Sequence, residues 1–243
     1  MNSSKYLIVV VVILTSSLFT ELSAKEKWWE KAIKAVTSSD VSEISNDEIS
    51  NAFKEALQIG SETVVQQLGT AGGFNNDATI HIPLPNNLIK VKKLLTKVGM
   101  SGMVDDLELK LNMAAEAATP KAKELFISAI SDMSFDDIQK IYNGPKDSAT
   151  QYFKSKMSAS LSTEMRPIVD ESLNDVGAIQ SFDNVMGKYK SLPYVPDVKS
   201  DLAEHVINKA MDGIFHYVAK EEAAIREDPL KQTTDLLKKV FSQ

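Results

Sequence analysis

The chain contains no cysteine among its 243 residues. This absence excludes a disulfide, a lipid-modified cysteine and a cysteine nucleophile, so stability must come from packing alone. Histidine is also scarce, with three residues, and no G-x-S-x-G, P-loop or G-x-G-x-x-G sequence is present. The usual signatures of serine hydrolases and nucleotide-binding enzymes are therefore missing.

A concentrated run of basic residues is missing as well. The chain carries 27 Lys and Arg against 33 Asp and Glu, which gives a formal net charge of −6. Nucleic acid binding needs a concentrated basic face, and electrostatic attachment to anionic lipid needs one too. From composition we therefore expect no nucleic acid partner and no electrostatic attachment to lipid.

The first 24 residues have the three parts of a secretory signal peptide. Lys5 is followed by an apolar run from Tyr6 to Leu14, and small residues lead to Ala24, after which we expect cleavage. The apolar run is shorter than the roughly 20 residues that cross a bilayer, so we expect no stable membrane insertion after cleavage. The expected destination is the periplasm; secretion, or retention by an uncleaved anchor, is the alternative.

Beyond the signal peptide, apolar residues recur with helical spacing. Helix start and stop signals divide residues 25–243 into about eight to ten helices, which predicts a single all-α, bundle-like domain. Residues 69–85, GTAGGFNNDATIHIPLP, are the longest break in this pattern and are expected to form a long ordered loop. A long helix is expected from Ser200 to about Arg226. Its apolar residues cover a wide arc, so we expect it to be central in the fold.

The polar turn NGPKDSATQYF, residues 143–153, is the first candidate site. A Gly-Pro turn that leads into a helix offers free backbone N–H groups, which favour a small anion or a polar ligand head. Lys146, Ser148, Thr150 and Tyr152 are the candidate ligand-binding residues. The alternative is an ordinary helix start with its aromatic residues in the core.

A stripe on the predicted helix after Ser200 is the second candidate site. Asp201, His205, Asp212 and His216 form two Asp–His pairs at i,i+4, a spacing that suits metal binding or acid–base chemistry. The two histidines are eleven residues apart, about 16 Å along a helix, so they cannot share one ion. A metal at either pair would need further ligands such as His81 or Glu116. A hydrated stripe with local ion pairs is the alternative, and Glu222 and Arg226 on the same helix form another i,i+4 pair.

Five segments carry a resemblance to a known family. They are GGFNNDATIHIPLP (72–85), NMAAEAATPKAKELF (112–126), NGPKDSATQYF (143–153), AMDGIFHYVAKEEAAIR (210–226) and TTDLLKKVF (233–241). In this order they resemble the bacterial domain-of-unknown-function family 4197. The resemblance implies a signal-bearing envelope protein of Gram-negative bacteria with a helical domain, and it supplies no catalytic residues.

These observations favour a binding protein over an enzyme. We expect a non-enzymatic periplasmic or envelope-associated module that binds an apolar or amphipathic small molecule or an envelope protein, without a cofactor. The alternative is a hydrolase or metal-dependent enzyme whose acids and histidines converge only in the fold. A large apolar cavity would favour a small ligand, and an exposed apolar patch would favour a partner.

Overall fold

The computed structural model describes residues 45–196, 198 and 200–227. The signal peptide expected in residues 1–24 lies outside these residues. In chain order the helices are α2 (Asn46–Leu68), the short 3-10 helix η1 (Asn86–Leu88), α3 (Ile89–Lys97), α4 (Ser101–Ala118), the 3-10 helix η2 (Thr119–Ala122), α5 (Lys123–Ser131), α6 (Phe135–Tyr142), α7 (Ser148–Asp175), α8 (Ala178–Lys190) and α9 (Leu202–Glu227). The described residues contain no strand, so the prediction of an all-α fold is confirmed.

Local signals account for several helix boundaries. Ser134 starts α6 with a capping box, in which its side chain accepts a hydrogen bond from the Asp137 N–H while the Asp137 carboxylate accepts one from the Ser134 N–H. Gly177 separates α7 from α8 in the left-handed conformation, with φ of 72°, which glycine adopts without steric cost. Pro120 lies in the first turn of η2, where its missing N–H costs no hydrogen bond.

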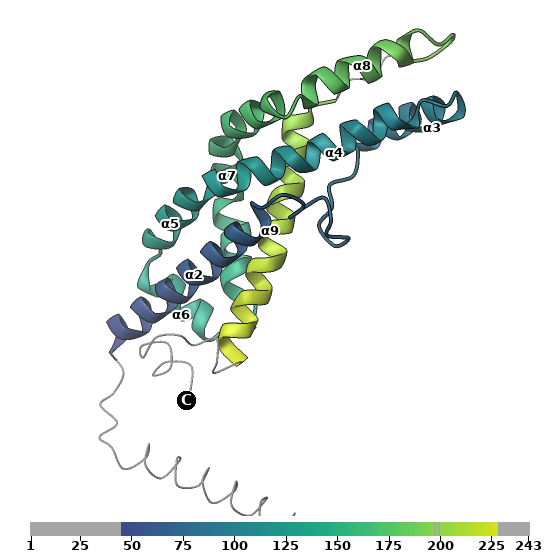
Figure 1. The fold of residues 1–243 in the computed structure, drawn as a ribbon. Coiled ribbons are helices and arrows are strands. Elements are labelled where there is room, and N and C mark those ends of the chain that lie inside the picture. The colour runs from purple at the N-terminus through teal and green to yellow at the C-terminus, as the bar shows by residue number, and fades with distance from the viewer. Residues whose placement is uncertain (1–44, 197, 199, 228–243) are drawn as a thin grey trace, which may run out of the picture. The chain divides into compact units, whose positions relative to one another are not determined.

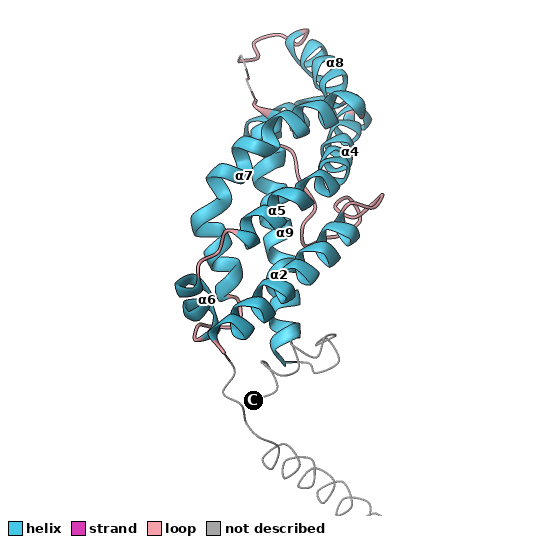
Figure 2. Ribbon diagram, turned by 90° about the vertical axis from the view of Figure 1, so that its left-hand side faces the viewer, coloured by secondary structure: helices cyan, strands magenta, loops and turns pink. Residues whose placement is uncertain are grey.

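Helix α9 is central, as its wide apolar arc predicts. It packs against α7, α2 and α4, and its buried residues include Val206, Ile214 and Phe215. In Figures 1 and 2, α2 and α7 run alongside α9. Because the helix is covered on several sides, its polar side chains are either buried or lie on the side that other helices leave open.

The helices of the described unit separate into two groups around α9. At one end, α2, α5, α6 and the first half of α7 pack together. At the other end, α8 packs on α4 and α3, and the α3–α4 hairpin and the turn after α8 extend in the same direction (Figure 1). The described residues include no helix that is both long enough and apolar enough to span a membrane.

Candidate functional site

The start of α7 is the candidate anion site, and a carboxylate of the protein itself lies there. The Ala149 N–H donates to Glu222 Oε1 at 3.0 Å, and the Thr150 N–H donates to Glu222 Oε2 at 3.0 Å. The Thr150 hydroxyl donates to the same Oε2, also at 3.0 Å. Glu222 is buried, with 7% of its surface exposed. The amides that the sequence offers to an anion therefore bind an internal one from α9.

Arg226 completes this cluster from the next turn of α9. Its Nη2 donates to Glu222 Oε1 at 3.0 Å, to the Ile141 carbonyl at 2.9 Å and to the Ser148 hydroxyl at 3.2 Å. The expected i,i+4 ion pair is thus present and largely buried. It links the end of α6, the start of α7 and α9, and the charge on Glu222 is compensated where solvent is excluded.

The four candidate ligand-binding residues do not share one open surface. Thr150 is buried against Glu222, and the Ser148 hydroxyl donates to the Ile141 carbonyl at 2.8 Å. Lys146 is exposed and pairs with Glu227, while Tyr152 donates to Asp137 Oδ2 at 3.1 Å. Each has a partner within the protein, and a ligand at this turn stays a prediction.

The four residues of the Asp–His stripe lie in separate surroundings. Asp201 caps the start of α9 by accepting from the Glu204 N–H and binds Arg166 Nη2 at 2.9 Å, and both contacts lower its pKa. His205 Nε2 lies 2.7 Å from the Pro83 carbonyl, and the His216 ring packs edge-on against its neighbour Tyr217. Asp212 is exposed beside an open depression of about 320 Å³.

No metal-binding group converges in the described part of the chain. Across residues 45–196, 198 and 200–227, no three His, Asp or Glu side chains lie within reach of one ion. His81 and Glu116 bind other partners, so they do not complete either Asp–His pair. The metal-dependent alternative stays a prediction without a converging set of described ligands.

Three polar residues of α4 hold the loop 69–85, and sequence reasoning did not identify them as a set. Glu116 Oε1 accepts the Phe74 and Asn75 N–H groups at 3.1 and 3.0 Å. Asn112 accepts from the Ile82 N–H at 2.8 Å and donates to the Ile82 carbonyl at 2.9 Å. The available signal was their spacing of four residues, with Glu108 four residues earlier, which places all three on one side of the helix.

Glu108, the first residue of this series, holds His81 and Lys92. Its Oε1 lies 3.1 Å from His81 Nε2, and its Oε2 accepts from Lys92 Nζ at 3.0 Å. Burial by itself raises the pKa of Glu108, but these two contacts outweigh burial and the pKa lies below its usual range. His81 therefore belongs to the anchoring of the loop.

The core contains little empty space. Two apolar cavities, one between Phe53 and Val218 and one between Phe126 and Met165, each have a volume of about 20 Å³. That volume is about the size of one water molecule, far below the several hundred Å³ that encloses a small apolar ligand. A larger depression, about 450 Å³, is an open surface hollow around Arg166, Asp170 and Asp201. Neither of these two apolar cavities could enclose a small apolar ligand.

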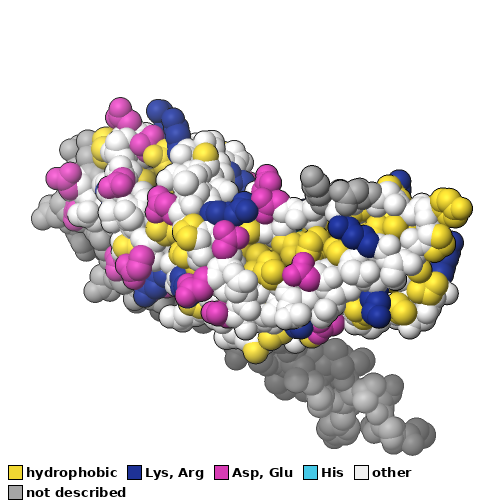
Figure 3. Space-filling view, turned by 90° about the horizontal axis from the view of Figure 1, so that it is seen from above, with side chains coloured by type: hydrophobic (Ala, Val, Ile, Leu, Met, Phe, Trp, Pro, Cys, Tyr) yellow, Lys and Arg dark blue, Asp and Glu magenta, His cyan; other side chains and the backbone are white. Residues whose placement is uncertain are grey.

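Exposed apolar side chains instead gather where α3 and α8 end. We call residues 89–100 and 186–196 the tip. Four of the eight large exposed hydrophobic side chains of the described part lie there: Ile89, Val98, Met100 and Tyr194. Val98 is 50% exposed and Tyr194 is fully exposed, at the end of its turn. On the face seen in Figure 3, hydrophobic and basic side chains lie at this end among other side chains and backbone.

The comparisons with known proteins agree with the resemblance. No curated protein and no solved structure matches the chain. A family model described as "Protein of unknown function (DUF4197)" matches residues 43–242, which include all the helices described above. The chain therefore belongs to the DUF4197 family.

Proposed function

We propose that this chain is an exported, non-enzymatic module that binds a component of the bacterial cell envelope through its tip. The signal peptide expected in residues 1–24 would deliver it to the periplasm of a Gram-negative bacterium. The observation that carries the proposal is the exposure of Val98, Met100 and Tyr194 at the ends of two adjacent turns. Exposed apolar side chains that gather at one place commonly mark a binding surface.

The packing of the core favours a surface partner over an enclosed ligand. With apolar cavities of about 20 Å³, an enclosed apolar ligand would have to separate packed helices. Three buried polar residues also have structural partners: Glu116 and Asn112 hold the loop, and Glu222 holds α7. Of the binding modes expected from the sequence, contact through an exposed apolar surface is the one that fits this geometry.

Cell fractionation tests this function. We expect the wild-type chain to lack residues 1–24 by mass spectrometry and to sediment with the envelope after lysis. The variant Val98→Ser/Met100→Ser/Tyr194→Ser should move to the soluble fraction, because the apolar contact surface is lost.

The matched control is Leu109→Ser/Met113→Ser/Ile179→Ser. These three side chains are 38–41% exposed and lie outside the tip. The control should sediment like the wild type, and circular dichroism melting should show that both variants are folded. A wild-type chain that stays in the soluble fraction, or a tip variant that sediments unchanged, would refute the proposal.

A further inference from the structure

Charge is strongly segregated between the tip and the rest of the chain. Residues 86–104 contain four lysines and no acidic residue, and residues 184–196 contain two lysines and no acidic residue. The whole chain has a net charge of −6, so the remainder carries −12 against +6 in these two stretches. Because α8 packs on α3 and α4, the two stretches lie at the same end of the described unit. The basic face is therefore formed by the fold and is hidden in the overall composition.

The lysines of α3 are arranged for contact with an outside partner. Lys90, Lys93 and Lys97 are exposed, and their spacing of three and four residues places them along one face of the helix. Lys92 lies on another side of α3, where its Nζ is 3.0 Å from Glu108 Oε2 and 3.6 Å from Asp105 Oδ1. These two carboxylates are thus directed to Lys92, and the exposed row of Lys90, Lys93 and Lys97 keeps its positive charge.

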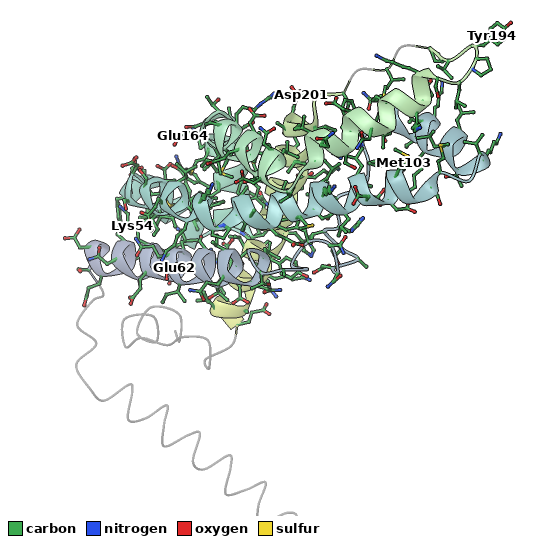
Figure 4. All side chains as sticks on the ribbon, turned by 45° about the horizontal axis from the view of Figure 1, so that its top comes forward. Lys54, Glu62, Met103, Glu164, Tyr194 and Asp201 are labelled. Atoms are coloured by element: carbon green, nitrogen blue, oxygen red, sulfur yellow. The ribbon has the colours of Figure 1, made fainter. Side chains whose placement is uncertain are left out.

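The two turns add apolar side chains beyond this row. Val98 and Met100 flank Gly99, whose φ of 78° closes the α3–α4 turn. Tyr194 projects from the turn after α8, and Figure 4 shows its side chain at the extreme end of the described unit. Exposed Tyr, Val and Met next to lysines have the composition of a surface that enters the headgroup region of a bilayer, where tyrosine is enriched.

We propose that the tip docks on the surface of a bilayer that contains anionic phospholipid. This inference rests on the proposed function and names its partner. The exposed lysines contact the lipid phosphates, and Val98, Met100 and Tyr194 enter the interface between headgroups and acyl chains. Docking differs from membrane insertion, because no described helix is apolar enough to span a bilayer.

The exposed lysines and the apolar turns together favour lipid over nucleic acid or a second copy of the chain. Nucleic acid would bind the lysines, but it offers no apolar environment for the three exposed side chains of the turns. A second copy would present the acidic part of its surface to the lysines and would likewise leave the apolar turns without an apolar environment. An anionic bilayer satisfies both the row of lysines and the apolar turns.

Vesicle co-sedimentation with the full chain purified from cells tests the inference. The probes are vesicles of phosphatidylethanolamine with phosphatidylglycerol, compared with vesicles of phosphatidylcholine alone. We expect binding to the anionic vesicles only, weakened by added salt. A lysine near an anionic surface contributes about fivefold in affinity, so Lys90→Gln/Lys93→Gln/Lys97→Gln should weaken binding about a hundredfold.

The matched control is Lys140→Gln/Lys156→Gln/Lys209→Gln, which removes the same charge from exposed positions on α6, α7 and α9. It should bind vesicles like the wild type. Equal loss in both triple variants, or no binding by the wild type, would overturn the lipid assignment. A wild-type chain that binds DNA or itself but not vesicles would also overturn it, if Lys90→Gln/Lys93→Gln/Lys97→Gln abolishes that binding and the control variant does not. If envelope fractionation still depends on the tip when vesicle binding fails, the proposed function stands and its partner is a protein.

Discussion

Asn112 forms hydrogen bonds with the backbone of the loop 69–85 as a neighbouring β-strand would. It is fully buried, and its amide pairs with both the N–H and the carbonyl of Ile82. Asn112→Leu keeps the side-chain size but leaves both backbone groups without partners, which should lower the free energy of unfolding by about 2–4 kcal/mol. Chemical denaturation measures the change. Asn174→Leu, at an exposed position of α7, is the control and should change stability by no more than about 0.5 kcal/mol.

Glu222 is the residue on which the junction of α6, α7 and α9 depends. Each carboxylate oxygen accepts two hydrogen bonds, so Glu222→Gln leaves one pair of donors facing an amide NH₂ group. We expect a loss of about 1–3 kcal/mol, because buried donors lose their acceptor and Arg226 loses its counter-charge. Thermal or urea unfolding checks this. Glu164→Gln, exposed on α7, should have almost no effect, and equal losses would contradict the role given to Glu222.

Tyr217 should give the stability of the fold a pH dependence through Asp77. The Tyr217 hydroxyl donates to Asp77 and holds the pKa of that carboxyl below its usual value. Because the folded pKa is lowered, the contribution is complete above the unfolded pKa of about 4 and is lost as the pH falls through the folded pKa. Tyr217→Phe should therefore destabilise the protein at neutral pH, by up to about 1 kcal/mol for a partly exposed pair.

Urea unfolding from neutral to acid pH measures this dependence. The difference between Tyr217→Phe and the wild type should shrink below about pH 4. On an Asp77→Asn background the carboxyl no longer titrates, so the same tyrosine substitution should have an effect that does not vary with pH in this range. A difference that stays constant in the wild-type background would contradict the assignment.

At the scale of elements, the loop 69–85 packs closely against α9 at Gly213. A Cβ atom at this position would lie 3.1 Å from Ile80 Cβ and 3.1 Å from Phe74 Cε1, closer than ordinary contact. Gly213→Ala should therefore destabilise the fold by about 1–2 kcal/mol, despite the better helix propensity of alanine. Gly187→Ala in α8, where a Cβ atom meets nothing within 4 Å, should stabilise it by about 0.5–1 kcal/mol. Opposite signs in thermal unfolding are the expected result, and a stabilising Gly213→Ala would contradict the close fit.

The helices could be predicted from the sequence because their signals are local. The glycine after Leu68, the capping box at Ser134 and the apolar arc of α9 each lie within one element and fix its limits or its position. The conformation of the loop 69–85 could not be predicted. The N–H groups of Phe74, Asn75 and Ile82 donate to side chains of α4 that lie 30 to 42 residues further along the chain.

The candidate anion site shows the same limit. The sequence indicates N–H groups without an acceptor inside the helix at the start of α7, and the structure has two of them at Ala149 and Thr150. Their acceptor is Glu222, 72 to 73 residues away, and no local pattern connects the two segments. Of the stripe, His205, Asp212 and His216 lie on α9, whereas Asp201 lies directly before its first residue. Helical spacing alone does not show which neighbours each side chain meets.

At the scale of the whole molecule, net charge does not predict how charge is distributed over the surface. An acidic chain with no basic run predicts no basic face, yet α3 and the end of α8 place six lysines at one end of the described unit. These segments are far apart in the sequence, so only their packing reveals the cluster. The same end carries the exposed apolar turns, which gives the fold an acidic part that is closely packed and a basic, apolar tip that is open to a partner.

Site-specific photo-crosslinking in living cells tests most directly whether the tip is the binding surface. A benzophenone amino acid would replace Val98, Tyr194 or, as the control, the exposed Glu164 on α7, which Figure 4 shows away from the tip. We predict that illumination gives lipid or protein adducts at positions 98 and 194 and none at position 164. Equal adducts at position 164, or none at positions 98 and 194, would contradict a function that acts through the tip.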